Sequence, residues 1–417
     1  MLLVDLPQGR LMLDEEIKAF IISAKPYRQW VKQSVVELSD LGPAEAPDYA
    51  GAKPAFMEPG QTESVLRLQQ IFGYTHEEWN KILKPMALEG HEPVNSMGYD
   101  APLAVLSTRP QLLFNYFKQR FAQVTNPPID AIREELVTSV EVLLGKEGNL
   151  LEPDPADYHK IRLDSPGLSP AKLNRLKKLN NADWKAATVS TLFPIQGGEQ
   201  ALERSLEDLL ETVDRHLDQG CNLLILSDRE VSRDQAAIPS LLAVSAVHHH
   251  LIRTGRRHQA SLIVESGEPR EVHHFAALLG YGANAIHPYL VYASLPLMAR
   301  ESETDLTLDE LAKRYEKAVS KGILKIMSKM GISTIQSYIG AQTFEAIGIG
   351  KQVIERYFPR TASQLGGLEL EDIARETLAR HREAFAREAD VLESGSDLQW
   401  RPGGETHLYR PETIHTL

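Results

Sequence analysis

From residue 184 onward, short apolar runs alternate with longer amphipathic stretches, and this alternation limits how the chain can fold more than any other feature. The apolar runs have the length of buried strands, and the stretches between them have the length and periodicity of helices. Repeated strand–helix alternation predicts a parallel sheet with helices on its faces. We expect strands at Ala187–Phe193, Asn222–Ser227, Ser261–Glu265, Ala283–Ile286 and Ile332–Ser337, and helices near Glu199–Gln219, Ala236–Thr254, Glu271–Gly280, Leu308–Met330 and Thr343–Ile347.

The number of these units decides between two α/β architectures. About five strand–helix units are present, with Leu103–Leu106 as a candidate further strand, whereas a closed barrel of this type has eight strands. Our first choice is therefore an α/β fold built as a partial or degraded (β/α)8-like barrel with an additional N-terminal helical region. An open doubly wound sheet is the alternative.

The first part of the chain reads as helical and irregular. Asp14–Gln33 suits a helix that Pro26 divides. Gln61–Phe72 and Thr75–Met86 look helical, and the second starts on a Thr with a Glu three residues later, which is a capping-box pattern. Between these stretches, Asp40–Gly60 contains several prolines and no apolar periodicity, so we expect a linker or an irregular surface excursion.

The composition is that of a soluble globular protein with more than one substructure. The 45 basic and 57 acidic side chains give a net charge of −12, which argues against nucleic acid or an anionic membrane as the main partner. The single cysteine, Cys221, excludes an internal disulfide and a Cys-ligated iron–sulfur cluster within this chain. No apolar stretch approaches the roughly 20 residues of a membrane helix, and we expect a cytoplasmic protein.

Polar side chains follow the predicted strands, at the place where parallel α/β sheets gather their ligands. They form either a remnant ligand site or a set of groups that satisfy one another where the strands stop. We favour the second interpretation, because no acid, base and anchor fall into a recognisable motif. The residues are Thr191, Ser227, Asp228, Arg229, Glu265, Ser266, His287, Gln336, Ser337 and Tyr338.

Two further patterns have a functional and a structural interpretation. The consecutive histidines 248–250 point about 100° apart on a helix and cannot converge on one metal ion, so we expect them, like the pair at 273–274, to pack and hydrogen-bond. Five lysines spaced four residues apart draw a basic stripe, which is either a solvated face, as we favour, or a docking edge for an acidic neighbouring domain. They are Lys313, Lys317, Lys321, Lys325 and Lys329. We expect Cys221 to be a small buried hydrophobe.

Five long segments of the sequence show a family resemblance. They are EPVNSMGYDAPLAVLS at 92–107, FNYFKQRFAQVTNPPIDAIREE at 114–135, IPSLLAVSAVHHHLIR at 238–253, REVHHFAALLGYG at 270–282 and GILKIMSKMGISTIQSYIGAQTFEAI at 322–347. Together they resemble the central region of the large subunit of glutamate synthase. The resemblance implies an amidotransferase domain before this region and an FMN-binding barrel after it.

The resemblance also implies the chemistry of the whole enzyme. The family converts glutamine and 2-oxoglutarate into two glutamates, using FMN, an iron–sulfur cluster and electrons from NADPH or ferredoxin, in some cases through a small electron-donating subunit. Ammonia passes through an internal tunnel between the two active sites. The central domain is similar to the flavin barrel in topology, holds no flavin, and helps to frame the tunnel.

On this resemblance, residues 1–16 are the junction from the amidotransferase domain and 391–417 are the start of the FMN-binding domain. The central α/β domain is 17–390, helical or irregular to about 183 and built of β/α repeats from about 184. Both ends look cut, so we expect a segment of a longer polypeptide that acts as a noncatalytic scaffold, without catalytic, cofactor-binding or metal-binding residues of its own. Thr125, Asn126 and Pro127 are candidate tunnel-facing residues. The alternative is an autonomous (β/α)-type enzyme or small-molecule binder that uses the polar strand ends.

Overall fold

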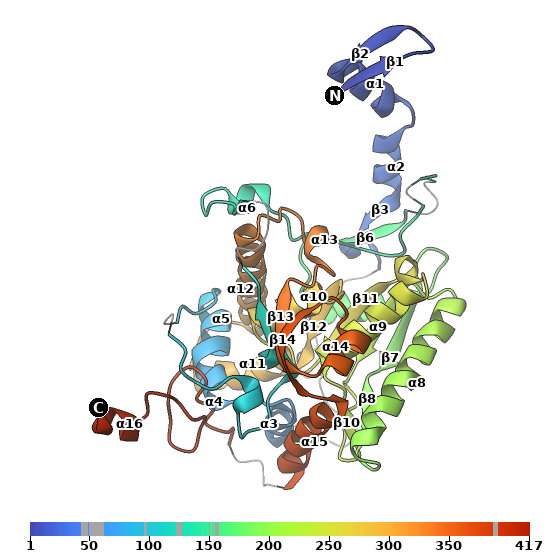
Figure 1. The fold of residues 1–417 in the computed structure, drawn as a ribbon. Coiled ribbons are helices and arrows are strands. Elements are labelled where there is room, and N and C mark those ends of the chain that lie inside the picture. The colour runs from blue at the N-terminus through green and yellow to red at the C-terminus, as the bar shows by residue number, and fades with distance from the viewer. Residues whose placement is uncertain are drawn as a thin grey trace.

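The computed structural model describes residues 1–42, 49, 62–95, 98–121, 127–149, 151–152, 154, 158–386 and 391–417, without the side chains of 62–64. Its body is a mixed α/β structure, and the N-terminal residues stand away from that body as a separate module (Figure 1). None of the helices within these ranges combines the length and the apolar character that crossing a membrane requires.

A four-stranded parallel sheet forms the centre of the body. Its strands are β7 (Ala186–Ser190), β9 (Leu223–Ser227), β11 (Ser261–Ser266) and β12 (Ala285–Pro288), and their spatial order is the order in which they occur in the chain. A (β/α) barrel has this sequential order, whereas a doubly wound sheet reverses its order at a switch point. Every residue of β9, β11 and β12 is buried, as expected for parallel strands covered on both faces.

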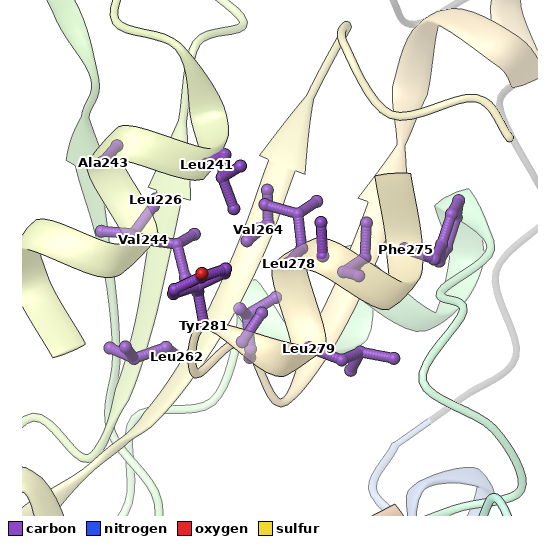
Figure 2. Packing of buried hydrophobic residues seen from close by; sticks show 14 of the residues in the cluster. Leu226, Leu241, Ala243, Val244, Leu262, Val264, Phe275, Leu278, Leu279 and Tyr281 are labelled. Atoms are coloured by element: carbon purple, nitrogen blue, oxygen red, sulfur yellow. The ribbon is translucent and has the colours of Figure 1, made fainter. Parts of the chain in front are cut away.

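Helices connect and cover these strands. They are α8 (Glu199–Asp218), α9 (Ser240–Arg253) and α10 (Val272–Gly280), and a small antiparallel pair, β8 (Leu192–Pro194) with β10 (Gln235–Ala237), precedes α9. Figure 2 shows the core between them, where Leu241 and Val244 of α9 lie beside Val264 of β11 and Tyr281, which follows α10. This buried apolar contact holds the helical layer on the sheet.

The remaining strand–helix units do not close a ring among the described residues. After β12 the chain forms α11 (Tyr289–Glu301) and α12 (Leu308–Lys329), and then β13 (Phe344–Ile349), α14 (Lys351–Tyr357), β14 (Ala362–Leu368) and α15 (Leu370–Ala386). Strand β13 pairs in parallel with β14 and antiparallel with β4 (Phe117–Gln119), in a sheet separate from the first. The prediction of a partial or degraded barrel with an added N-terminal region is therefore confirmed.

The N-terminal module is a hairpin of β1 (Leu2–Asp5) and β2 (Arg10–Leu13), followed by α1 (Asp14–Ser23) and α2 (Tyr27–Ser34). The predicted break at Pro26 lies between the two helices and is confirmed. Strand β3 (Val35–Glu37) then joins a sheet with β6 (Lys160–Leu163) and β5 (Val142–Leu144). The other helices are α3 (Thr62–Ile71), α4 (His76–Glu78), a π-helical turn (Trp79–Leu83), α5 (Lys84–Glu89), α6 (Glu134–Val137), α7 (Pro170–Lys177) and α16 (Pro411–Thr416).

Three predicted elements are wrong. The predicted strand Ile332–Ser337 contains a turn and the start of the short helix α13 (Ile335–Tyr338), because its backbone is held by Ser139 rather than by a sheet. The predicted helix Thr343–Ile347 is wrong because all of its residues after Thr343 lie in β13, where strands on both sides supply the hydrogen bonds. The predicted strand Leu103–Leu106 is a 3-10 turn, Ala104–Leu106. Most of Asp40–Gly60 lies outside the described residues.

Candidate functional site

The polar strand ends of the central sheet meet in one buried row. Register pairs Glu265 at the end of β11 with Ser227 on β9 and with His287 on β12. All three side chains are buried. Sequence reasoning placed these three residues at strand ends, and the structure brings them together.

Glu265 is the electrostatic centre of this row. Lys177 Nζ donates to both carboxylate oxygens at 2.7 and 2.9 Å, Arg229 Nε donates at 2.6 Å, and Ser227 Oγ donates at 2.8 Å. Burial alone would raise the pKa of Glu265, but the charges of Arg229 and Lys177 outweigh burial and lower this pKa to about 2. The carboxylate is therefore ionised and fully engaged by groups of the chain itself.

Asp228, the next residue in the chain, has its own partners on the neighbouring strand end. Its carboxylate accepts hydrogen bonds from Ser266 Oγ and from the backbone N–H of Gly267. Burial raises the pKa of Asp228 to about 7, against the lowering effect of the Ser266 hydrogen bond. The Arg229 guanidinium, which binds Glu265, lies 4.6 Å from the centre of the Tyr289 ring. The aromatic ring thus covers one face of the guanidinium group.

The other predicted strand-end residues do not join this row. Thr191 serves through its backbone, since its N–H donates to the Ser227 carbonyl at 2.8 Å and its carbonyl accepts from Ile238 at 2.9 Å. Gln336, Ser337 and Tyr338 lie on or beside α13, because the strand predicted there does not form. The Tyr338 hydroxyl donates to Gln119 Oε1 at 2.8 Å.

Arg270 is a hub that sequence reasoning missed. Its guanidinium is 2% exposed and donates to both carboxylate oxygens of Glu78, at 3.0 and 3.1 Å. It also donates to the carbonyls of Phe72 and Gly73 at 3.0 and 2.8 Å, and it lies 4.3 Å from the centre of the Tyr74 ring. No local sequence pattern signals this role, because its partners lie nearly 200 residues earlier. Arg270 thus fixes the loop that leads into α4.

The start of α4 in turn holds the C-terminal segment 393–405. Glu77 is buried, and its Oε2 accepts the backbone N–H groups of Ser396 at 3.1 Å and Leu398 at 3.0 Å. The backbone N–H of His76 donates to the Glu393 carbonyl at 2.7 Å, and that of Glu77 donates to Ser394 at 3.2 Å. This segment is thus tied to the body at several points along its length.

A second set of contacts holds the same segment from the other side. Ser107 Oγ donates to Glu405 Oε2 at 2.6 Å. His407 lies between Asp100, whose Oδ1 is 2.8 Å from its Nδ1, and the Ser396 carbonyl, and these contacts raise the pKa of His407 although burial opposes them. Asp100 and Ser107 therefore also hold the C-terminal residues on the body.

A cavity of about 1050 Å³ lies between the C-terminal segment and the body. Burial, followed by the charge of Glu78, raises the pKa of Glu271 to about 7. Burial and the same carboxylate raise the pKa of Asp397 to about 6. Burial lowers the pKa of Lys118, opposed by Glu271 and Asp397. The cavity therefore brings charged groups of both signs together. Its charged lining also includes Glu77, Glu78, Arg109, Arg270, Arg380, Glu383, Glu393 and Glu405.

The histidine pairs take part in packing and hydrogen bonding, as predicted. His248 Nδ1 accepts from Arg257 Nε at 2.9 Å, and His250 Nε2 lies 2.7 Å from Asp214 Oδ2. His273 Nε2 lies 3.1 Å from the Phe114 carbonyl, and His274 stacks on the Phe114 ring at 4.3 Å. Within the described ranges, no group of three or more His, Cys, Asp or Glu side chains is arranged to hold a metal ion.

The remaining predicted features are placed as follows. Of the candidate tunnel-facing residues, Thr125 and Asn126 lie outside the described residues, and Pro127 is exposed. The five lysines of α12 are all exposed along one face, and Gly331 follows the helix with a left-handed φ of 67°. Cys221 is buried, as predicted.

The strand order and the paired strand ends define a barrel-like α/β domain whose polar groups bind one another. The family model described as the glutamate synthase central domain matches residues 67–350, and the chain belongs to this family. The chain is 50% identical to the glutamate synthase [NADPH] large chain of Bacillus subtilis, and 42% identical to ferredoxin-dependent glutamate synthases of Synechocystis and Spinacia oleracea. Each comparison covers 100% of this chain but only 26%, 27% and 26% of the relative, so the chain spans about a quarter of their length.

Comparison with solved structures finds flavoenzymes. A mutant flavocytochrome b2 with pyruvate bound gives a TM-score of 0.35 at 9% identity, covering 74% of this chain and 100% of that chain. Mandelate oxidase with benzoyl-formic acid gives a TM-score of 0.25 at 11% identity, covering 62% of this chain and 96% of that chain.

Proposed function

We propose that this chain is the noncatalytic connecting domain of a glutamate synthase large subunit. It holds a glutaminase site and an FMN site in fixed relation and helps to frame the passage of ammonia between them. The whole enzyme would form two L-glutamates from L-glutamine and 2-oxoglutarate with reducing equivalents. The observation that carries the proposal is the docking of the C-terminal segment on α4 through Glu77.

That docking suits a connection that must fix the position of the next domain. A carboxylate that accepts two backbone N–H groups in a buried setting forms strong, charge-assisted hydrogen bonds. Two backbone hydrogen bonds from α4 to residues 393 and 394 add to it. Whatever follows this segment therefore starts from a fixed place and direction. We assign residues 1–16 to the junction with an amidotransferase domain, 17–390 to the central domain and 391–417 to the start of the FMN-binding domain.

The N-terminal hairpin supports a second contact of the same kind. Register puts Leu2, Val4, Leu11 and Leu13 on one face of the hairpin, and these side chains are between 54% and 66% exposed. A two-stranded hairpin has little stability of its own, and an apolar outer face favours a further layer. The amidotransferase domain of the same polypeptide is the layer that we propose.

The groups of this chain do not fit the cofactors of the proposed enzyme. A flavin phosphate at the strand ends would meet the buried Glu265 carboxylate, whose two cationic neighbours are already engaged. A cluster held by cysteines needs more than the one cysteine of the sequence. We therefore assign FMN and the iron–sulfur cluster to other domains, and the electrons to a small partner subunit or ferredoxin.

The conduit itself is proposed at the segment that precedes α6. We retain Thr125, Asn126 and Pro127 as candidate tunnel-facing residues, supported by the exposure of Pro127 and by the stiff main chain that adjacent prolines give. A cytoplasmic location is the setting we propose for the enzyme.

The decisive test uses the full-length large subunit with its electron donor. Glu77→Ala should leave glutamine hydrolysis in place but release free ammonia, so that more glutamine is consumed per 2-oxoglutarate converted. Glu412→Ala, at an exposed position of α16, is the matched control and should keep the coupling. Unchanged coupling in Glu77→Ala, together with a loosened C-terminal segment, would reject the connecting role. Flavin absorbance in the isolated chain, or a ligand that titrates at Ser227–Arg229, would instead favour an autonomous enzyme or binder.

A further inference from the structure

The short helix α6 and the residues before it present apolar side chains to solvent. Ile132 is 93% exposed, Leu136 is 84% exposed and Val137 is 48% exposed. Single exposed apolar residues are common on protein surfaces, but a group gathered on one protruding element marks a contact surface.

The protrusion is held in place by its backbone at both ends. The N–H of Ile129 donates to the Ser328 carbonyl at the end of α12, at 2.8 Å. Beyond α6, Ser139 donates to Ser333 at 2.8 Å and accepts from Ile335 at 3.0 Å. These bonds fix the protrusion without using its apolar side chains, which remain available to a partner.

Side-chain contacts also fix how α6 is oriented on the body. The Asp130 carboxylate accepts the N–H groups of Ile132 at 3.0 Å and of Arg133 at 2.9 Å, which starts the turn before α6. Glu135, on the side of α6 that meets α12, pairs with Lys321 at 3.1 Å. The polar side of α6 thus faces α12.

The lysine stripe of α12 meets α6 at the Lys321–Glu135 ion pair. Lys317, Lys321, Lys325 and Lys329 are exposed on the helix to which α6 is anchored. Lys321 is paired with Glu135, and together the four lysines give this side of α12 a basic strip on a chain of net charge −12. A complementary partner offers an apolar hollow bordered by carboxylates.

The position of this surface indicates which partner covers it. In Figure 1, α6 lies at the same end of the body as the N-terminal module, whereas the C-terminus lies at the other end. About three quarters of the length of the curated relatives lies outside the matched chain. A domain attached at the N-terminal module is therefore within reach of α6.

We propose that Ile132, Leu136, Val137 and the α12 lysines form one docking surface, the α6–α12 surface, for an acidic, apolar-centred face of the domain that precedes this chain. This inference rests on the proposed function, because it takes the preceding domain to be part of the same polypeptide. It adds the place of contact and the chemistry of the partner face. The surface then fixes the domain arrangement at a second point, away from the N-terminal hairpin.

Zero-length carbodiimide cross-linking of the full-length large subunit, read by mass spectrometry, tests the contact. We expect Lys321, Lys325 or Lys329 to link to Asp or Glu residues that precede this chain. Lys351, an exposed lysine on α14, is the control and should not link to that domain. Links to residues that follow this chain, links between isotopically mixed copies, or the absence of links to the α12 lysines would each overturn the proposal.

Variants separate the surface from the stability of the fold. Leu136→Asp places a charge on a side chain that is exposed here, so the fold should tolerate it, while burying that charge at a contact is costly. Cross-linking yield should fall about tenfold or more, equivalent to at least about 1.4 kcal/mol of contact free energy. Leu151→Asp, at another exposed leucine, should not change it. An unchanged yield in Leu136→Asp rejects this surface and leaves the Glu77 coupling experiment unaffected.

Discussion

The Glu77 carboxylate accepts the backbone N–H of Ser396, 319 residues later in the chain, at 3.1 Å. The same oxygen accepts the N–H of Leu398 at 3.0 Å. A carboxylate near the N-terminus of a helix thus closes a loop of more than 300 residues. Arg270 and Glu78 hold the loop before that helix, so one contiguous set of polar contacts links the β11 strand end to the C-terminal segment.

Replacement of Glu77 by alanine should loosen this closure. The two backbone N–H groups would lose a charged acceptor in a buried setting, so we expect the free energy of unfolding to fall by about 2–4 kcal/mol. Hydrogen exchange should rise at residues 394–398 and remain unchanged in β9 and β11. Protection at 394–398 equal to that of the unmodified chain would show that Glu77 does not hold the segment.

Arg270→Lys tests whether the hub depends on the geometry of the guanidinium or only on its charge. A lysine keeps the charge but cannot bind both oxygens of Glu78 and two carbonyls at once. We expect a loss of about 3–5 kcal/mol, because buried groups lose their partners. Thermal unfolding measures this loss, with the exposed Arg410→Lys as control. A Lys variant as stable as the control would mean that charge alone is sufficient.

Glu265→Gln should leave Lys177 and Arg229, which are 29% and 24% exposed, without their buried counter-charge. We expect a loss of about 1.5–3 kcal/mol near neutral pH, because charged hydrogen bonds to the carboxylate are lost. Since Arg229 and Lys177 lower the pKa of Glu265 to about 2, its stabilising contribution is present above about 4.5 and is lost as the pH falls toward 2. The stability difference between the two proteins, measured by urea unfolding, should therefore shrink below pH 4.5. A difference that stays constant down to pH 2.5 would contradict this ion-pair account.

Glu271→Gln should have the opposite pH dependence. Burial and the charge of Glu78 raise the pKa of Glu271 from its usual value of 4.5 to about 7, so ionising it in the folded state costs free energy. Its contribution to stability is present below pH 4.5 and is lost as the pH rises through about 7. The Gln variant should be more stable than the parent at pH 8 and similar to it at pH 4.5. Equal stability at both pH values would show that Glu271 is not held in this state.

The sequence predicted the elements that have strong local signals. Helices α8 and α12 have long amphipathic patterns, and the capping box at Thr75 and Glu78 forms as expected. The predicted helix at 343–347 failed because its helix-favouring residues are outweighed by pairing with β4 and β14 on either side. The pairing with β4 depends on residues more than 200 positions earlier, and neither pairing has a local signature.

The residues of the strand-end site also differ in whether the sequence could predict them. Ser227, Glu265 and His287 could be brought together from the sequence, because parallel strands place their carboxyl ends at one edge. Lys177 could not, since it is the last residue of α7, a helix outside the predicted repeats, and nothing around it indicates a buried partner. The role of Arg270 could not be predicted for the same reason.

The burial of Cys221 has a practical consequence for following these contacts. Because the sequence offers no second sulfhydryl, a cysteine introduced at an exposed position such as Leu136 would be the one thiol-reactive handle of this chain under native conditions. A spin label or fluorophore attached there would report the surroundings of that one position, because the native cysteine of this chain is buried and would not compete for the reagent.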